Sequence, residues 1–129
     1  MLRRFRRNTF VRRLAANRLT QRLLRLFERI VPADAKIRES LLACSLDVVI
    51  VTPTNLRKGE EIEYVKAAKA LNIPTVVPVH TWDNLTTKDL IHVAPDLTLV
   101  WNLAQLKEAV DIHGIPECQI VITGTPIMD

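Results

Sequence analysis

The sequence predicts an α/β fold: a Rossmann-like parallel sheet of about four strands flanked by helices, with a basic amphipathic N-terminal helix. Two observations predict the sheet. A strand–helix–strand unit occurs twice in the sequence, and the predicted strands are uninterrupted apolar runs. The predicted elements are strand 48–51, helix 60–71, strand 75–79, strand 97–101, helix 103–113 and strand 119–123. Strands that alternate with helices of this length are typical of β-α-β units with parallel strands.

Both predicted helices end in the same way, which supports the repeated unit. Helix 60–71 is followed by Asn-Ile-Pro at 72–74, and helix 103–113 runs into Gly-Ile-Pro at 114–116. Asn and Gly tolerate the left-handed cap conformation, the isoleucine can contact the preceding turn, and proline prevents the helix from continuing. At the start of the second helix, Asn102 and Gln105 have the spacing of a capping pair.

The strands carry little alternation of polar and apolar residues. Val-Val-Ile-Val at 48–51 and Thr-Val-Val-Pro-Val at 75–79 are examples. Strands buried on both faces have this pattern, so we expect a parallel sheet sandwiched by helices. Nothing N-terminal to strand 48–51 reads as its strand partner, and an exposed apolar edge invites unwanted pairing. The basic helix, a partner protein or a neighbouring segment outside this chain are the alternatives for covering that edge.

Charge divides the chain into two predicted parts, a basic helical arm over 1–32 and an α/β domain over 33–129. Residues 1–29 contain ten arginines and one acid, a net +9, whereas residues 30–129 carry eight Lys or Arg and thirteen Asp or Glu, a net −5. An apolar stripe at helical spacing borders a cationic one, formed by Leu19, Leu23, Leu26, Phe27 and Ile30 beside Arg18, Arg22, Arg25 and Arg29. Such a helix packs on a core, contacts anionic lipid or serves as a mitochondrial presequence. Nucleic acid is a disfavoured partner because no aromatic residue interleaves the arginines.

Composition and missing motifs exclude several classes of protein. No uncharged apolar run reaches the ~18 residues of a transmembrane helix, and no secretory apolar region follows the basic start. Cys44 and Cys118 have no CxxC spacing, so we interpret them as reduced packing residues of a cytoplasmic protein. The arm adds the alternative of a peripheral position at the inner face of the membrane. With three glycines and three scattered histidines, the chain shows no nucleotide-binding motif, hydrolase motif or metal-ligand pattern, and we predict no cofactor and no metal.

The loop that follows strand 75–79 carries the strongest functional signal. In open parallel sheets, ligands bind at the carboxyl ends of the strands. His80 and Asp83 are the candidate catalytic acid or base. The candidate substrate-binding residues are Trp82 as a stacking face, Asn84, Thr86 and Thr87 as partners for sugar hydroxyls, Lys88 as a charge for a phosphate or carboxylate, and Asn102 at the neighbouring strand end.

Structural roles compete with these functional ones. Asp83 and Asn84 can form an Asx-turn, Thr86 or Thr87 can cap a short helix over 88–92, and Asn102 can be the N-cap of the second helix. The segments 52–55 and 123–126 end the outer strands at the same edge, where they would line a cleft.

The series of segments resembles a known family. Val-Val-Ile-Val-Thr-Pro at 48–53, Tyr-Val-Lys-Ala-Ala-Lys-Ala-Leu-Asn-Ile-Pro-Thr at 64–75 and Trp-Asp-Asn-Leu-Thr-Thr-Lys at 82–88 open the series. Pro-Asp at 95–96, Val-Trp-Asn at 100–102, Glu-Ala-Val at 108–110, His-Gly-Ile-Pro at 113–116 and the run 121–125 with Asp129 continue it in order. Together they resemble bacterial GT-B-type glycosyltransferase-like proteins, similar to surface-polysaccharide and glycerophosphotransferase enzymes. The chain departs from that pattern at His80-Thr81, where the family has Ser before Trp82, and at Asp89, where it has Gly.

The resemblance implies a two-domain enzyme with catalysis in the cleft between two Rossmann-like domains. The amino-terminal domain receives the acceptor and the carboxyl-terminal domain binds the nucleotide-activated donor. This chain would be part of the acceptor side, inactive without the donor domain, in the transfer of a sugar or a glycerol-phosphate-like unit to a surface-glycan or lipid-linked acceptor. No catalytic role for His80 follows from the resemblance. The alternative is a stand-alone α/β binding module whose Arg-rich helix binds an anionic membrane or a partner protein.

Overall fold

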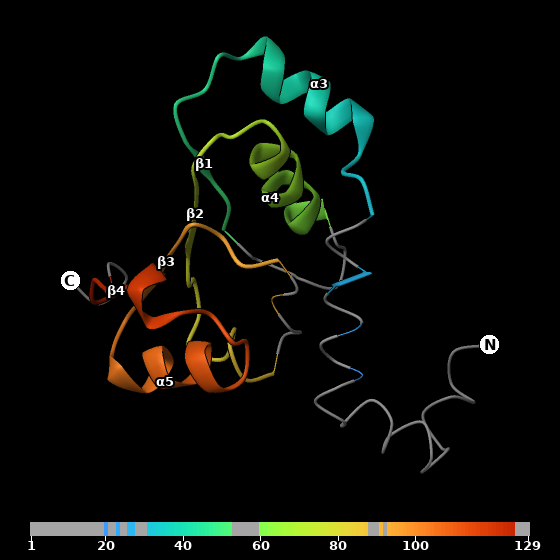
Figure 1. Ribbon diagram of the computed structural model, residues 1–129. Helices are drawn as coiled ribbons and strands as arrows, with labels where there is room; N and C mark the ends of the chain where they lie inside the picture. The colour runs from blue at the N-terminus through green and yellow to red at the C-terminus, as the bar shows by residue number, and fades with distance from the viewer. Residues whose placement is uncertain are drawn as a thin grey trace. The chain divides into compact units, whose positions relative to one another are not determined.

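The computed structural model describes residues 20, 23, 26–27, 31–52, 60–87, 91 and 93–125 (Figure 1). The chain divides into two compact units, Met1–Val31 and Pro32–Asp129. In the first unit the described residues Thr20, Leu23, Leu26 and Phe27 are helical. The four arginines predicted to contact a membrane, Arg18, Arg22, Arg25 and Arg29, lie outside the described residues. None of the helices in the described part of the chain is long and apolar enough to cross a membrane.

The second unit contains a four-stranded parallel sheet, which confirms the predicted α/β fold class. The strands lie in chain order, β1-β2-β3-β4, and helices flank them (Figure 1). The elements are α3 (Ala35–Ala43), β1 (Val49–Ile50), α4 (Glu60–Ala70), β2 (Thr75–Pro78), β3 (Leu97–Val100), α5 (Leu103–Asp111), the 3-10 helix η3 (Glu117–Gln119) and β4 (Ile120–Ile122). The helices α3 and η3 were not predicted. Helix α3 begins where the Asp34 carboxylate accepts hydrogen bonds from the backbone N–H groups of Lys36 and Ile37.

The two main helices end as the sequence predicts. Asn72 and Gly114 both adopt positive φ, +57° and +67° respectively. The isoleucine after each, Ile73 and Ile115, donates its backbone N–H to a carbonyl of the last helical turn, at 2.9 Å and 3.1 Å. These bonds satisfy carbonyls that a helix end would otherwise leave unpaired, and Ile115 is buried in the core. Each helix therefore returns the chain directly to the next strand.

Burial alternates along the strands, which differs from the expected burial on both faces. One face bears the buried residues Val49, Val51, Val77, Val79, Val100 and Ile120, and both α4 and α5 pack on it. The opposite face bears Ile50, Val76, Pro78, Leu97, Leu99 and Val121, and these residues belong to neither core cluster. The strand order accounts for this. Crossovers between parallel strands are right-handed in nearly all proteins, and when parallel strands lie in chain order such crossovers all fall on one side of the sheet.

Strand β1 is an edge strand, in agreement with the lack of a strand partner in the sequence. Its Ile50 side chain is 63% exposed. Cys44 and Cys118 are free thiols, and both are exposed. The interpretation of the two cysteines as packing residues was therefore wrong, because neither segment inserts its sulfur into the core.

Candidate functional site

The carboxyl ends of all four strands surround a hollow of about 250 Å³. Its lining residues are Thr52, Pro78, Val79, His80, Leu99, Trp101, Thr123 and Gly124. Each lining residue lies no more than two positions from the last residue of a strand. The parallel topology therefore brings together segments that are far apart in the chain. The segments 52–55 and 123–126 were predicted to line a cleft at this edge, and of their residues Thr52, Thr123 and Gly124 line the hollow. Thr125 is not among the lining residues, and residues 53–55 and 126 lie outside the described residues. This is where a parallel α/β sheet is expected to bind a ligand.

The indole of Trp101 forms one wall of the hollow and is held firmly. Its Nε1–H donates to the carbonyl oxygen of Val79 at 2.8 Å, which joins the ends of β2 and β3. The Trp101 backbone N–H donates to Oε1 of Gln105 at 2.8 Å, and the Gln105 N–H donates to Oδ1 of Asn102 at 3.0 Å. One of the two bonds of the predicted Asn102–Gln105 capping pair is therefore confirmed, because the Gln105 side chain accepts from the backbone of Trp101 and not from that of Asn102. Asn102 serves as the N-cap of α5, and its side-chain oxygen is occupied there.

Small polar groups complete the rim of the hollow. The His80 side chain is exposed, and so are the hydroxyl-bearing residues Thr52 and Thr123. The Thr123 hydroxyl donates to the carbonyl oxygens of Val100 and Gly124 at 3.5 Å and 3.3 Å, and it keeps a lone pair for a ligand. Gly124 has φ +78°, and a Cβ built on it would meet nothing within 4 Å. The rim beside Gly124 is therefore open.

The loop after His80 is a hydrogen-bonded turn. Asn84, which is 2% exposed, accepts the backbone N–H of Thr81 at 2.7 Å through Oδ1, and it also accepts the Thr81 hydroxyl. The Thr81 hydroxyl contacts the Asp83 carboxylate at 2.7 Å as well. The hydroxyls of Thr86 and Thr87 donate to the backbone carbonyl of Asp83 at 3.4 Å and 3.2 Å. Four of the predicted site residues thus have structural hydrogen bonds within the turn.

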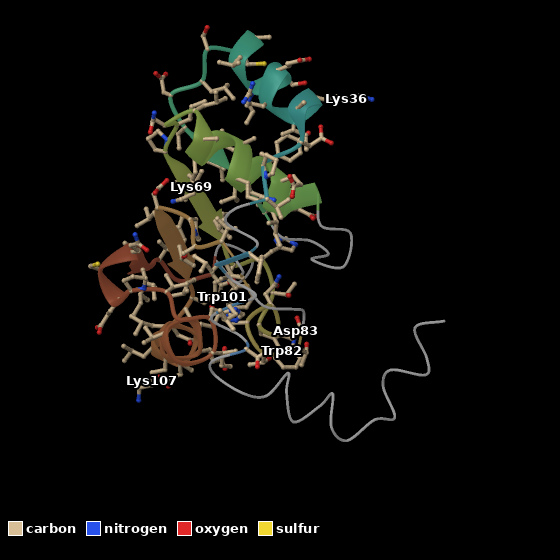
Figure 2. All side chains as sticks on the ribbon, turned by 45° about the vertical axis from the view of Figure 1, so that its right-hand side comes forward. Lys36, Lys69, Trp82, Asp83, Trp101 and Lys107 are labelled. Carbon is tan, nitrogen blue, oxygen red and sulfur yellow. The ribbon has the colours of Figure 1, made fainter. Side chains whose placement is uncertain are left out.

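Two further candidates of the loop differ from those four. Trp82 is 73% exposed, and its indole forms no hydrogen bond with another of the described residues. Figure 2 shows Trp82 and Asp83 in the same part of the domain as Trp101. Lys88 lies outside the described residues. Of the predicted catalytic pair, His80 lines the hollow and Asp83 does not.

A buried histidine that the sequence did not single out for the site anchors this loop. His113, 3% exposed, follows the last turn of α5. Its Nε2 lies 2.8 Å from the Leu85 carbonyl oxygen, and its Nδ1 accepts the Ile91 backbone N–H at 3.0 Å. The ring is therefore the neutral Nε2–H tautomer, assigned from these two partners. No local signal could have found this role, because His113 is 28 residues from Leu85 along the chain.

The described residues that line the hollow are uncharged side chains. They combine an indole, an imidazole, two hydroxyls and apolar groups, and none of these described residues is Asp, Glu, Lys or Arg. The part of the chain that the structure describes has no group of three His, Cys, Asp or Glu residues that could hold a metal ion. Comparisons of the chain with protein families, curated proteins and solved structures gave no match.

Proposed function

We propose that this chain is the acceptor side of a GT-B glycosyltransferase-like protein and that the hollow binds a sugar ring of the acceptor. The observation that carries the proposal is the combination of an indole wall and hydroxyl and imidazole groups among the described residues of one hollow at the carboxyl edge of a parallel sheet. A sugar ring has an apolar face of C–H groups and a polar periphery, so it suits an aromatic wall with a polar rim. The family resemblance, which covers residues 45–129, supports the same assignment.

His80 is the proposed general base. In the reaction, an acceptor hydroxyl attacks the anomeric carbon of a nucleotide-activated sugar, and a bond forms between that oxygen and the carbon. The bond from the carbon to the phosphate oxygen breaks, the nucleotide leaves with the electron pair, and the hydroxyl proton passes to a ring nitrogen of His80. An imidazole suits this role because histidine is the side chain that most often accepts or gives a proton in general acid–base catalysis. The family resemblance assigns the donor to a second domain, so acceptor binding is the property to test first.

The test is a titration of the full chain with the methyl glycosides of glucose, galactose, mannose and N-acetylglucosamine. Trp101 fluorescence in a Trp82→Phe background reports binding to the hollow. We expect at least one sugar to bind, and Thr123→Val to weaken it at least fivefold. Ser40→Ala is the matched control, because it removes an exposed hydroxyl on α3, an element that does not line the hollow. The proposal would be refuted if none of the four sugars changed the fluorescence of Trp101. It would also be refuted if Thr123→Val and Ser40→Ala lowered the affinity for the sugar equally.

Peripheral binding to an anionic membrane is the second candidate function. The observation in its favour is the +9 charge of residues 1–29, together with the helical conformation of Leu23, Leu26 and Phe27, which have the spacing of one helix face. Sedimentation with anionic vesicles tests it. Binding should fall steeply as salt is raised, because counterions screen the arginines, and phosphatidylcholine vesicles should not bind. Equal binding to both kinds of vesicle would exclude an electrostatic membrane contact.

A further inference from the structure

Trp82 is the most exposed of the large apolar side chains described in the structure, at 73%. Tryptophan is highly buried on average, because leaving so large an apolar surface in water is unfavourable. The Trp82 side chain is not part of either core cluster and does not line the hollow. Core packing therefore does not account for a tryptophan here.

The turn that carries Trp82 is fixed on both sides. Before it, Thr81 is bound to Asn84 through its backbone N–H and its hydroxyl. After it, Asn84 and Leu85 are each 2% exposed, and His113 holds the Leu85 carbonyl at 2.8 Å. A binding group on a rigid turn loses little conformational entropy when a ligand arrives. The turn thus presents the indole in a preorganised way, as binding sites do with aromatic anchors.

Trp82 lies next to the hollow. It is two residues from His80, which lines the hollow, so their Cα atoms are at most about 7.6 Å apart. That separation is comparable with the span of one or two sugar rings. A ring in the hollow and a second ring on Trp82 can therefore belong to one continuous ligand.

The surrounding groups select the chemistry of that ligand. Asp83 is the charged residue among the described residues 79–87 of the loop, and Lys88, which follows them, lies outside the described residues. A carboxylate repels phosphates and other anions, whereas it accepts hydrogen bonds from sugar hydroxyls. The hydroxyls of Thr86 and Thr87, both exposed residues, lie on the same turn. These groups favour a neutral saccharide over a nucleic acid or an anionic lipid.

We propose that Trp82 is a second stacking surface and that the acceptor is an oligosaccharide extending from the hollow onto the turn. This inference rests on the proposed function, because the hollow must hold the first sugar ring. Trp82 then determines acceptor length. A monosaccharide occupies only the hollow, whereas a longer oligosaccharide also contacts the indole of Trp82.

The experiment compares sugars of one to four units in the series of the monosaccharide that binds the hollow, with affinities measured by calorimetry on the full chain. A stacking contact worth about 1.4 kcal/mol corresponds to tenfold in affinity. We expect the trisaccharide to bind wild type about tenfold more tightly than the monosaccharide, and Trp82→Ala to abolish that gain. The Trp82→Ala variant should bind the monosaccharide as wild type does, and Trp82→Tyr should retain most of the gain. Leu103→Ala is the matched control, because Leu103 is 67% exposed and also lies at the carboxyl edge.

The outcomes separate this inference from the proposed function. If the monosaccharide binds through Trp101 and Thr123 but longer chains bind no better, the inference is overturned and the proposed function stands. If Leu103→Ala removes the gain as completely as Trp82→Ala does, the stacking role is overturned. If Trp82→Ala leaves oligosaccharide affinity unchanged and reduces binding to anionic vesicles, the residue contacts a membrane instead. If no sugar binds the hollow, the proposed function itself fails.

Discussion

Replacing Asp96 by alanine should lower the free energy of unfolding by about 3 kcal/mol at pH 7. Asp96 lies at the amino edge of the sheet, opposite the hollow, and joins β2 to β3 through its side chain. Its Oδ2 accepts the Thr75 backbone N–H at 2.9 Å and the Thr75 hydroxyl at 2.7 Å, while its Oδ1 accepts Nζ of Lys69 at 2.7 Å. Thr75 is fully buried, and its backbone N–H and its hydroxyl both donate to this one carboxylate oxygen.

The magnitude follows from these partners. Each buried Thr75 donor left without an acceptor costs about 1–3 kcal/mol. The ion pair adds less than about 1 kcal/mol, because the side chains of Lys69 and Asp96 are 35% and 47% exposed. Asp96→Asn keeps an acceptor oxygen for Thr75 and loses the ion pair, so we expect a cost of about 1 kcal/mol.

The pH dependence separates charge from packing. The hydrogen bond from Lys69 and those from Thr75 lower the pKa of Asp96 from 3.8 to about 2, against the opposing effect of burial. The folded-state pKa lies below the unfolded one, so the charge-dependent stability is complete above 3.8 and is lost as the pH falls through about 2. This charge-dependent stability is measured by urea unfolding at pH 7, 4 and 2, with circular dichroism as the signal. The difference between wild type and Asp96→Asn should shrink to near zero at pH 2. An equal difference at all three pH values would refute the reasoning.

Substitutions at three other positions test local features, each by thermal or urea unfolding. Asn102→Ala should cost about 1 kcal/mol, because it removes the N-cap of α5, whereas Asn102→Asp should cost little; equal costs would contradict the capping role. Asn72→Val should cost at least about 1 kcal/mol and Asn72→Gly should not, because φ is +57° there; a tolerated valine would contradict the left-handed cap. His113→Phe should cost about 2–3 kcal/mol by unpairing the Leu85 carbonyl and the Ile91 N–H, and hydrogen exchange at Ile91 should rise with it. Unchanged exchange at Ile91 would contradict the anchor.

The helix ends could be predicted from the sequence because their causes are local. A left-handed residue, an isoleucine and a proline within three positions are enough to end a helix, and both Asn72 and Gly114 behave accordingly. The same holds for Asn102 and Gln105, whose spacing alone defines the capping pair. Part of the strand order could also be predicted from the sequence, since the lack of a strand partner before strand 48–51 indicated that this strand lies at an edge of the sheet.

The exposure of the second sheet face could not be predicted in this way. An apolar run such as 75–79 has the same pattern whether one face or both are covered. Which face is covered depends on the order of all four strands and the handedness of their crossovers, and those are properties of the whole domain. Ile50 and Val121 are apolar residues of this kind, 63% and 44% exposed respectively.

The candidate site shows the same division between local and global causes. Polarity after a strand is visible in the sequence, so Thr52, His80 and Thr123 could be placed at the carboxyl edge. The hydrogen bonds of Asp83 and Asn84 could not, because an Asx-turn and a binding loop require the same residue types. The proposed sugar site uses residues at strand ends, which the sheet holds in place, more than residues of the loop. Trp82 is the exception in the loop, because a turn with its own hydrogen bonds and buried anchors gives it comparable rigidity.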